Sequence, residues 1–425
     1  MSAARQLRNF WIPCVAIIVM ACLGNAFAQT SYRMTDLGTV GTDNESMIMS
    51  LNNEGLSYIM AGNVGGLGPN NLFGQLENGH AYLGVGRHLF DLGTLGGQNT
   101  WMNWGEINDW VQIVGYSETN VPDPNGEDIC GFGTHLTCLP FLWQPFSHMR
   151  ALPTLGGNNG QASGINDLGQ IVGMSENGKV DPTCSPTATN NRVQLPTVWN
   201  NGRPQALPTG NNPDGLAFWS NDYGQIVGDT STCGNATIFA ASWKNNTLTT
   251  LPDYGTGSFA FAVNNPGVAA GSVGSADNST QYGAIWTNGV LTNLGLLPGD
   301  FGGIADSINS RGQVVGGNWD PHFYWNHAFV WQNGVMADLN TLIPDNANLY
   351  AVFAGAINDR GQIGGQAVVI SGPEKGNIHS FLATPVNKRI RRSIADVVHT
   401  RPTSNLPANV GEQHLPGFRL VPFRR

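Results

Sequence analysis

Most of the chain alternates between short apolar segments and turns that are rich in Asn, Gly and Pro. The apolar segments are a few residues long and contain β-branched or aromatic side chains, as strands do. The clearest turn lies in 162–173, where the sequence ASGINDLGQIVG places Asn-Asp-x-Gly between two such segments. An Asn-Asp-x-Gly sequence favours a tight turn in which Gly takes a positive φ. The pattern therefore predicts a β-hairpin here.

The hairpin sequence recurs along the chain, and one asparagine marks each copy. The marker asparagines are Asn52, Asn108, Asn166, Asn221, Asn264, Asn309 and Asn358. Their spacing of 43 to 58 residues is that of a propeller blade and not of a helical hairpin. Each copy holds four segments in fixed order: Leu-Gly-Thr, Ile-Asn-Asp, Gln-Ile-Val-Gly, and one that ends in an aromatic residue. Seven copies of four strands predict an all-β, seven-bladed β-propeller.

The two ends of the repeat region predict how the ring closes. The first recognisable segment, at 36–39, is a Leu-Gly-Thr strand with no partner in its own repeat. The last, at 379–382, lacks a Leu-Gly-Thr strand after it. We therefore expect the N-terminal strand to complete the last blade, which leaves no open sheet edge.

The combined motifs resemble the HAF family of bacterial extracellular repeat proteins. His327-Ala328-Phe329-Val330-Trp331 matches the name-giving motif, and 80–82 and 379–381 match it in part. The resemblance covers roughly 32–385 and is weakest at 208–210 and 266–267, where Pro and Gly replace the expected residues. It implies export and a repeat fold, and it supplies no catalytic residues.

The first 28 residues have the features of a secretory signal. Arg5 and Arg8 precede an apolar run over 11–23, and small residues at 26 and 28 suit cleavage. The run is too short for a typical transmembrane helix. Lipid attachment at Cys22 is the alternative. No other apolar stretch could span a membrane, so we expect a secreted chain with a signal (1–28), a propeller (29–385) and a tail (386–425).

Acidic residues dominate the predicted propeller, whereas basic residues dominate the tail. Residues 29–385 contain 10 Lys and Arg against 27 Asp and Glu, a net charge of −17. Residues 386–425 contain 8 basic and 2 acidic residues, a net charge of +6. The acidic body argues against nucleic-acid binding, because neutralising phosphates requires a basic surface. The tail sequence KRIRR (388–392) suits a solvated, disordered extension; the alternative is docking to an anionic cell surface or to the acidic propeller itself.

Four cysteines remain once the signal is removed, and an even number in an exported chain predicts two disulfides. Cys130 and Cys138 share one loop, which favours their pairing and leaves Cys184 with Cys233. These cysteines belong to loops that follow Gln-Ile-Val-Gly, on what we call the long-loop face. The short Asn-Asp-x-Gly turns lie on the opposite, turn face. Long pinned loops on a rigid scaffold often carry binding sites, so we expect binding at the long-loop face.

Aromatic residues outside the recurring strand positions are the candidate binding residues. They are Trp101, Trp104, Trp319, Phe323 and Trp325. Flat rings near Asn and Asp suit carbohydrate recognition, because rings stack on sugar C–H faces while polar groups bond the hydroxyls. The alternative role for these rings is packing within loops or between blades.

Signals for catalysis or metal binding are weak, and no HExxH, GxSxG or phosphate-loop motif is present. His322 and His327 with Asp320 form a candidate metal or acid–base cluster, although His327 belongs to the repeat, which favours a structural role. Asp300 and Asp306 are a candidate carboxylate pair for glycoside hydrolysis. One loop offers oxygen ligands for calcium without the spacing of an EF-hand. The residues of that loop are Asp123, Asn125, Glu127 and Asp128.

These observations lead to three hypotheses. The first is a secreted, non-enzymatic protein that binds an extracellular polysaccharide or a surface protein through its long-loop face. The second is a carbohydrate-active hydrolase or lyase on a propeller scaffold. It would be favoured if two or more acidic side chains met at the mouth of the central channel. The third is a purely structural cell-surface protein.

Overall fold

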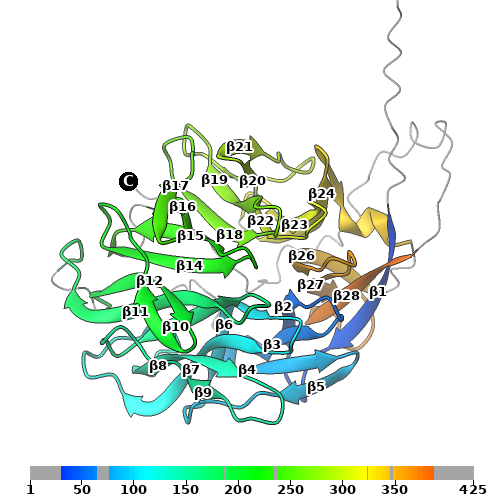
Figure 1. Ribbon diagram of the computed structural model, residues 1–425. Helices are drawn as coiled ribbons and strands as arrows, with labels where there is room; N and C mark the ends of the chain where they lie inside the picture. The colour runs from blue at the N-terminus through cyan, green and yellow to red at the C-terminus, as the bar shows by residue number, and fades with distance from the viewer. Residues whose placement is uncertain are drawn as a thin grey trace, which may run out of the picture.

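The computed structural model describes residues 30–64, 76–185, 188, 190–233, 238–322, 324–344 and 348–386. Within these ranges the chain forms 28 strands and one short 3₁₀ helix, so the all-β prediction is confirmed (Figure 1). The predicted signal and the predicted tail beyond Val386 lie outside the described residues. No helix among the described residues is both long and apolar enough to cross a membrane.

Five sheets each contain four antiparallel strands in chain order, the unit of a β-propeller. The first is β6 (Thr100–Ile107), β7 (Ile113–Pro122), β8 (Leu136–Trp143) and β9 (Arg150–Ala151). The second is β10 (Gly160–Ile165), β11 (Ile171–Val180), β12 (Arg192–Asn200) and β13 (Arg203–Ala206). The third is β14 (Asp214–Ser220), β15 (Gln225–Ser231), β16 (Ile238–Lys244) and β17 (Thr247–Thr250). The fourth is β18 (Ser258–Val263), β19 (Ala269–Gly274), β20 (Gln281–Thr287) and β21 (Val290–Asn293). The fifth is β22 (Gly302–Ile308), β23 (Val314–Trp319), β24 (Trp325–Gln332) and β25 (Val335–Asp338), which η2 (Leu339–Leu342) follows.

The remaining eight strands form one sheet that brings the two ends of the repeat region together. One part is β2 (Glu45–Leu51), β3 (Ser57–Val64), β4 (Leu76–Val85) and β5 (His88–Asp91). The other is β26 (Leu349–Ile357), β27 (Ile363–Val369), β28 (Ile378–Val386) and β1 (Ser31–Gly38). β1 pairs antiparallel with β28, as the motif order predicts. The two parts are joined by one parallel pair, Glu45 with Ile378.

The glycines of the repeat have identifiable steric roles. Gly169 and Gly224 occupy the turns at φ angles of +77° and +72°, which side chains rarely adopt. Gly173 in β11 faces β10 across a register shift between Ala162 and Gly164. A Cβ atom at Gly173 would lie 2.0 Å from the carbonyl oxygen of Gln161, so only glycine fits. The Gln-Ile-Val-Gly motif therefore ends in glycine because the first strand passes too closely for any side chain.

Tryptophans in the third strands tie successive sheets together. Trp199, Trp243 and Trp286 are among the largest fully buried side chains. Each indole N–H donates to a proline carbonyl of the segment that precedes its sheet. The pairs are Trp199 with Pro153 O at 2.7 Å, Trp243 with Pro208 O at 2.7 Å and Trp286 with Pro252 O at 2.8 Å. Since each buried indole has a partner for its N–H, these tryptophans are structural.

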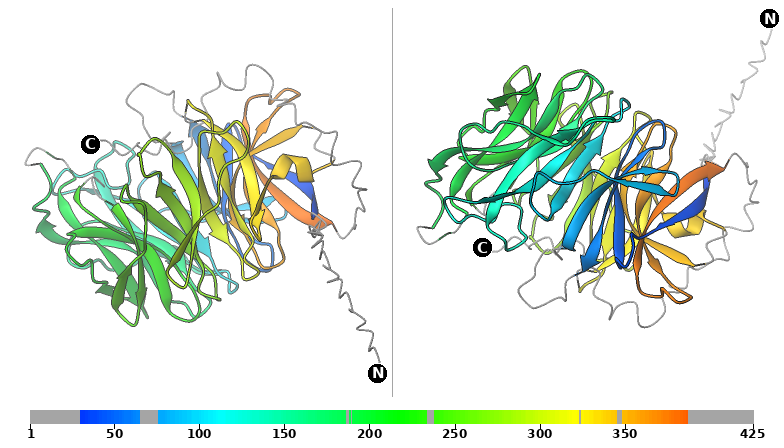
Figure 2. Two further views of the ribbon diagram at one scale, coloured as in Figure 1. Left: turned by 90° about the horizontal axis from the view of Figure 1, so that it is seen from above. Right: turned by 90° about the horizontal axis from the view of Figure 1, so that it is seen from below.

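Apolar side chains fill the space between the first strands of the sheets. These strands contact one another from sheet to sheet. Met47 of β2, Ile304 of β22 and Phe353 of β26 belong to one buried cluster with Phe218 and Phe261. The rings of Phe218 and Phe261 meet edge to face with their centroids 5.4 Å apart. Figure 2 shows the sheets from the two sides of this arrangement.

Candidate functional site: an acidic cavity on the turn face

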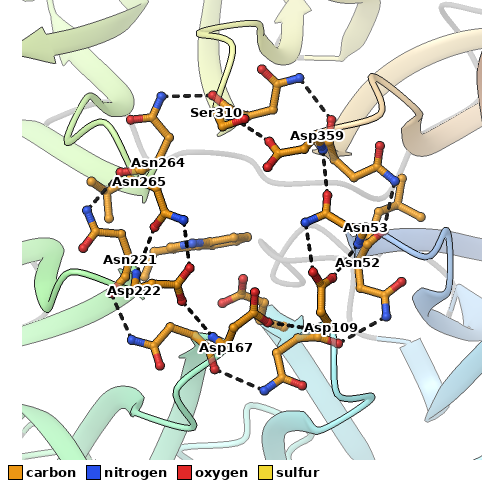
Figure 3. Close-up of a pocket in the computed structure, with 18 of the residues that line it drawn as sticks. Asn52, Asn53, Asp109, Asp167, Asn221, Asp222, Asn264, Asn265, Ser310 and Asp359 are labelled. Carbon is orange, nitrogen blue, oxygen red and sulfur yellow. Dashed lines mark hydrogen bonds between the residues drawn. The ribbon is translucent and has the colours of Figure 1, made fainter.

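The Asn-Asp-x-Gly turns converge around a cavity of about 130 Å³, which we call the turn-face cavity (Figure 3). Its lining comes from all seven hairpins between the first and second strands of the four-stranded units. Acidic residues among the lining are Glu106, Asp109, Asp167, Asp222 and Asp359. Trp219 and Ser220 also line it, at the end of β14. The cavity is therefore a polar, acidic space.

The marker asparagines build the wall of the cavity. Within one turn, Asn166 Oδ1 accepts the backbone N–H groups of Leu168 and Gln170 at 3.1 and 2.9 Å. Its Nδ2 donates to the carbonyl oxygen of Asn221 in the next turn at 2.9 Å. All seven asparagines make this second bond, including Asn358, which returns to Asn52. The hydrogen bonds therefore form a closed cycle, with distances between 2.9 and 3.2 Å.

The residue after each asparagine forms a second layer of bonds between turns. Asp167 Oδ1 accepts the backbone N–H of Asp109 at 2.8 Å, and Asp222 Oδ1 accepts that of Asp167 at 3.0 Å. Asn53 and Asn265 make the same bond through their own Oδ1 atoms, to Asp359 and Asp222. A neutral amide can thus replace the carboxylate without loss of this contact. The negative charge of the aspartates is not required for the turn.

Burial raises the pKa of the Glu106 carboxyl well above its usual value, and the nearby charges of Asp167, Asp222 and Asp109 raise it further. Only 7% of Glu106 is exposed, and its Oε2 accepts the backbone N–H of Ile165 at 2.9 Å. Burial also raises the pKa of Asp167. Ser220 is 2% exposed, and its Oγ has no hydrogen-bond partner among the described residues. The cavity therefore holds protonatable and unpaired polar groups that a ligand could engage.

The turns around the cavity differ most at one position, the third residue of each turn, which is the x of Asn-Asp-x-Gly. These rim residues are Glu54, Trp110, Leu168, Tyr223, Pro266, Arg311 and Arg360. Trp110, Leu168 and Tyr223 are 72%, 76% and 70% exposed, although apolar groups are costly to leave in water. The Trp110 indole N–H donates to the carbonyl oxygen of Asp167 at 3.0 Å, which fixes the ring. Three adjacent turns therefore present an apolar arc beside the acidic cavity.

The aromatic residues predicted to bind ligand lie elsewhere, and four of the five belong to strands. Trp101 and Trp104 belong to β6, and their side chains lie outside the described part of the structure. Trp319 ends β23 and Trp325 begins β24, where they are 5% and 3% exposed. Their rings pack edge to face at 5.3 Å. The alternative role, packing, describes these two residues, because so little of each ring can meet a sugar. Phe323 lies outside the described residues.

The predicted histidine cluster is replaced by a recurring His–Asp pair. His327 Nδ1 lies 2.9 Å from the carboxylate of Asp300, and Asp320 instead accepts the backbone N–H of His322 at 2.8 Å. Burial lowers the pKa of His327, but the hydrogen bond to Asp300 and the charges of Asp300 and Asp338 together outweigh burial, so the pKa is raised. The equivalent pairs are His80 with Asp91 and His379 with Asp36, each at 2.9 Å. The repeat histidines therefore hold neighbouring segments together. Asp300 is paired with His327, and Asp306 is buried in β22. The positions of these two residues therefore do not suggest a pair of catalytic carboxylates.

The oxygens of the predicted calcium loop bond groups of the protein. Asp123 Oδ1 accepts the N–H groups of Asn125 and Glu127 at 2.7 and 3.0 Å. Glu127 Oε1 accepts the N–H of Asn191 at 2.9 Å, and Asp128 Oδ2 accepts that of Gly133 at 2.8 Å. These bonds order the loop, and calcium binding there stays a prediction.

Both predicted disulfides are present, and their pairing is confirmed. Cys130 is bonded to Cys138 and Cys184 to Cys233, with Cα atoms 5.5 and 5.0 Å apart. The first bridge closes a loop within one sheet. The second links the loops of two successive sheets, so it pins the long-loop face as expected.

No protein-family model matches the chain, and no curated protein sequence matches it. Solved structures resemble it only distantly. The extracellular domain of a putative one-component system from B. thetaiotaomicron is 11% identical, with a TM-score of 0.40; the match covers 82% of this chain and 39% of that one. A gluconolactonase from Xanthomonas campestris is 9% identical, with coverages of 85% and 93% and a TM-score of 0.41. A streptogramin B lyase is 10% identical, with coverages of 83% and 98% and a TM-score of 0.41. At this distance the matches assign neither a family nor an activity.

Proposed function

We propose that the chain is a secreted, non-enzymatic binding protein built as a closed, seven-bladed propeller. The pairing of β1 with β28 and the asparagine cycle from Asn358 back to Asn52 support the closed ring. The two disulfides and the signal-like sequence over 1–28 support export, because disulfides persist mainly in oxidising compartments. The resemblance to the HAF family agrees with both.

The ligand site is the turn face, and the ligand is a carbohydrate chain that carries amino groups. The observation that carries this proposal is the exposure of Trp110 and Tyr223 beside an acidic cavity. Exposed rings offer stacking faces for sugars, and the Asp and Asn side chains offer hydrogen-bond partners. The carboxylates favour a protonated amine and disfavour a uronic acid, because like charges repel in a partly buried site.

The proposal is tested by calorimetric titration with oligosaccharides of glucosamine, N-acetylglucosamine and galacturonic acid. The glucosamine chain should bind most tightly and the galacturonate chain least. Trp110→Ala and Tyr223→Ala should each weaken binding by about tenfold, the upper range for one aromatic contact. Phe90→Ala and Tyr254→Ala are matched controls, since these rings are exposed away from the cavity. Absence of binding to every oligosaccharide, or tightest binding of galacturonate, would overturn the proposal.

Hydrolysis of a glycoside is the second candidate function, because acidic side chains meet at the mouth of the ring. Glu106, with its raised pKa, would donate a proton to the glycosidic oxygen, and a neighbouring carboxylate would activate water. Glu106→Gln separates the two functions. In a hydrolase this substitution abolishes the formation of hydrolysis products, while oligosaccharide binding persists. In a binding protein neither the wild type nor Glu106→Gln releases product.

A further inference from the structure

The basic tail of the chain begins beside the turn-face cavity. β28 runs from Ile378, which pairs with the start of β2, towards the turns. Its residue Ala383 pairs with Ile363, the first residue of β27 after the Asp359-Arg360-Gly361 turn. A Cβ atom at Gly361 would lie only 3.4 Å from Pro385 Cγ. The chain therefore leaves its last described strand on the turn face, next to one of the turns that line the cavity.

The length of the intervening chain matches the distance from β28 to the nearest turn that lines the cavity. β26, which precedes the Asp359 turn, is separated from β28 by two strand spacings, or roughly 10 Å. The basic residues of the tail are Lys388, Arg389, Arg391 and Arg392. They follow Val386 by two to six residues, over which an extended chain reaches roughly 7 to 20 Å. No long linker is needed to bring the basic cluster to the edge of the cavity at the Asp359 turn.

The charges are complementary. The cavity is lined by Asp109, Asp167 and Asp222 on one side, and Glu106 and Ser220 present further polar groups. On the other side, Arg360 pairs with Glu54 at 3.0 Å, and Arg311 occupies the next rim position. An incoming guanidinium group is therefore attracted to the side with Asp109, Asp167 and Asp222. Arg suits this role, because its planar donors can bond two carboxylate oxygens at once.

We propose that the basic cluster 388–392 of this same chain occupies the turn-face cavity, with its guanidinium groups against Asp109, Asp167 and Asp222. The inference requires the acidic cavity but not the carbohydrate. A bound tail would cover the site that the ligand needs, so ligand and tail compete. An intramolecular segment needs little intrinsic affinity, because the short connection keeps its effective concentration high.

Limited digestion of the full chain with trypsin tests this proposal. Bonds after Lys388, Arg389, Arg391 and Arg392 should be cut about tenfold more slowly than the Arg419–Leu420 bond of the same tail, because cleavage follows the released population. The protection should disappear at about 1 M salt, where the screening length falls to about 3 Å. It should also disappear in the double variant Asp167→Asn, Asp222→Asn.

The asparagine variants keep the fold, because Asn53 and Asn265 already make the same bonds in this layer. Asp253→Asn with Asp277→Asn is the matched control, since it removes the same charge from loops away from the cavity and should leave the protection unchanged. Equal cutting rates at the cluster and at Arg419 would overturn the proposal. Protection that survives both high salt and the cavity variants would also overturn it, because the cause would then be proximity to β28 alone.

Competition between the tail and the carbohydrate is measured in a separate binding experiment. Neutralising the cluster with Lys388→Gln, Arg389→Gln, Arg391→Gln and Arg392→Gln should increase the affinity for glucosamine oligosaccharides several-fold. Digestion is measured without any sugar, so a failure of the carbohydrate proposal leaves the digestion result intact.

Discussion

The two faces of this propeller use their residues in opposite ways. On the long-loop face, sequence and length vary freely, yet Trp319 and Trp325 are buried and the polar side chains of the 123–128 loop bond groups of the protein. On the turn face, the backbone repeats, and variation is concentrated at the rim position. The exposed apolar side chains Trp110, Leu168 and Tyr223 all occupy that position. The variable loops therefore need not carry the binding site. A repeated turn can carry it instead, because one position of the turn is free to vary.

The largest loss of stability should come from removing the disulfides of the long-loop face. Removing the Cys184–Cys233 bridge by a double change to Ser frees a loop of 49 residues and should cost about 4 kcal/mol of unfolding free energy. The Cys130–Cys138 bridge spans 8 residues, and its removal should cost about 2.5 kcal/mol. Urea denaturation measures both. Ligand affinity at the turn face should be unchanged in the folded proteins, and a matching loss of affinity would contradict the separation of the two faces.

A smaller loss is expected from one turn of the other face. Asn166→Ala removes three hydrogen bonds, to Leu168, Gln170 and Asn221, and should cost about 3 kcal/mol at roughly 1 kcal/mol for each bond. Leu168→Ala, at the rim of the same turn, should change stability by less than about 0.5 kcal/mol. Thermal and urea denaturation distinguish the two variants. Equal losses of unfolding free energy in the two variants would show that the rim residue stabilises the turn as much as the asparagine does.

A further effect, which is a slope and not a single loss of stability, should be a change in pH dependence. Burial raises the pKa of Asp229 to about 8, and it raises those of Asp214 and Glu176 to about 7. A carboxyl whose pKa is raised on folding holds its proton in the folded state, so stability falls as pH rises from about 4 towards 8. Asp229→Asn should flatten this decline, as seen in melting temperatures across that range. An unchanged slope would remove Asp229 as a cause.

Much of the fold can be predicted from the sequence, because the repeat encodes it locally. Asn-Asp-x-Gly predicts the turn through positive-φ glycine, and the order of motifs predicts the β1–β28 pairing. Placement in one loop favours the cysteine pairing that the structure has, although four cysteines allow three connectivities. Bonds between turns, such as Asp109 to Asp167, join residues 58 positions apart, and no local pattern indicates them. Burial of Trp319 and Trp325 also depends on neighbouring sheets.

One signal for the cavity was present in the sequence. Aligning the turns on their asparagines places Trp110, Leu168 and Tyr223 at one equivalent position, where a turn normally carries a polar residue. A bulky apolar residue at an exposed turn position stands out in such an alignment, whereas each looks ordinary in its own segment. The pKa of Glu106, in contrast, depends on a burial that only the packing of the sheets creates.

The asparagine cycle also has a consequence for how such a chain can be rearranged. Every turn is donor to one neighbour and acceptor from the other, and Asn358 and Asn52, 306 positions apart, are bonded like any adjacent pair. The asparagine cycle itself thus does not differ between the pair that joins the two ends of the repeat region and the other pairs. A circular permutant opened in the loop at 275–280 would keep all of these bonds. Recombination that exchanges one whole repeat for another would also keep them, because each neighbouring turn offers the same donor or acceptor group.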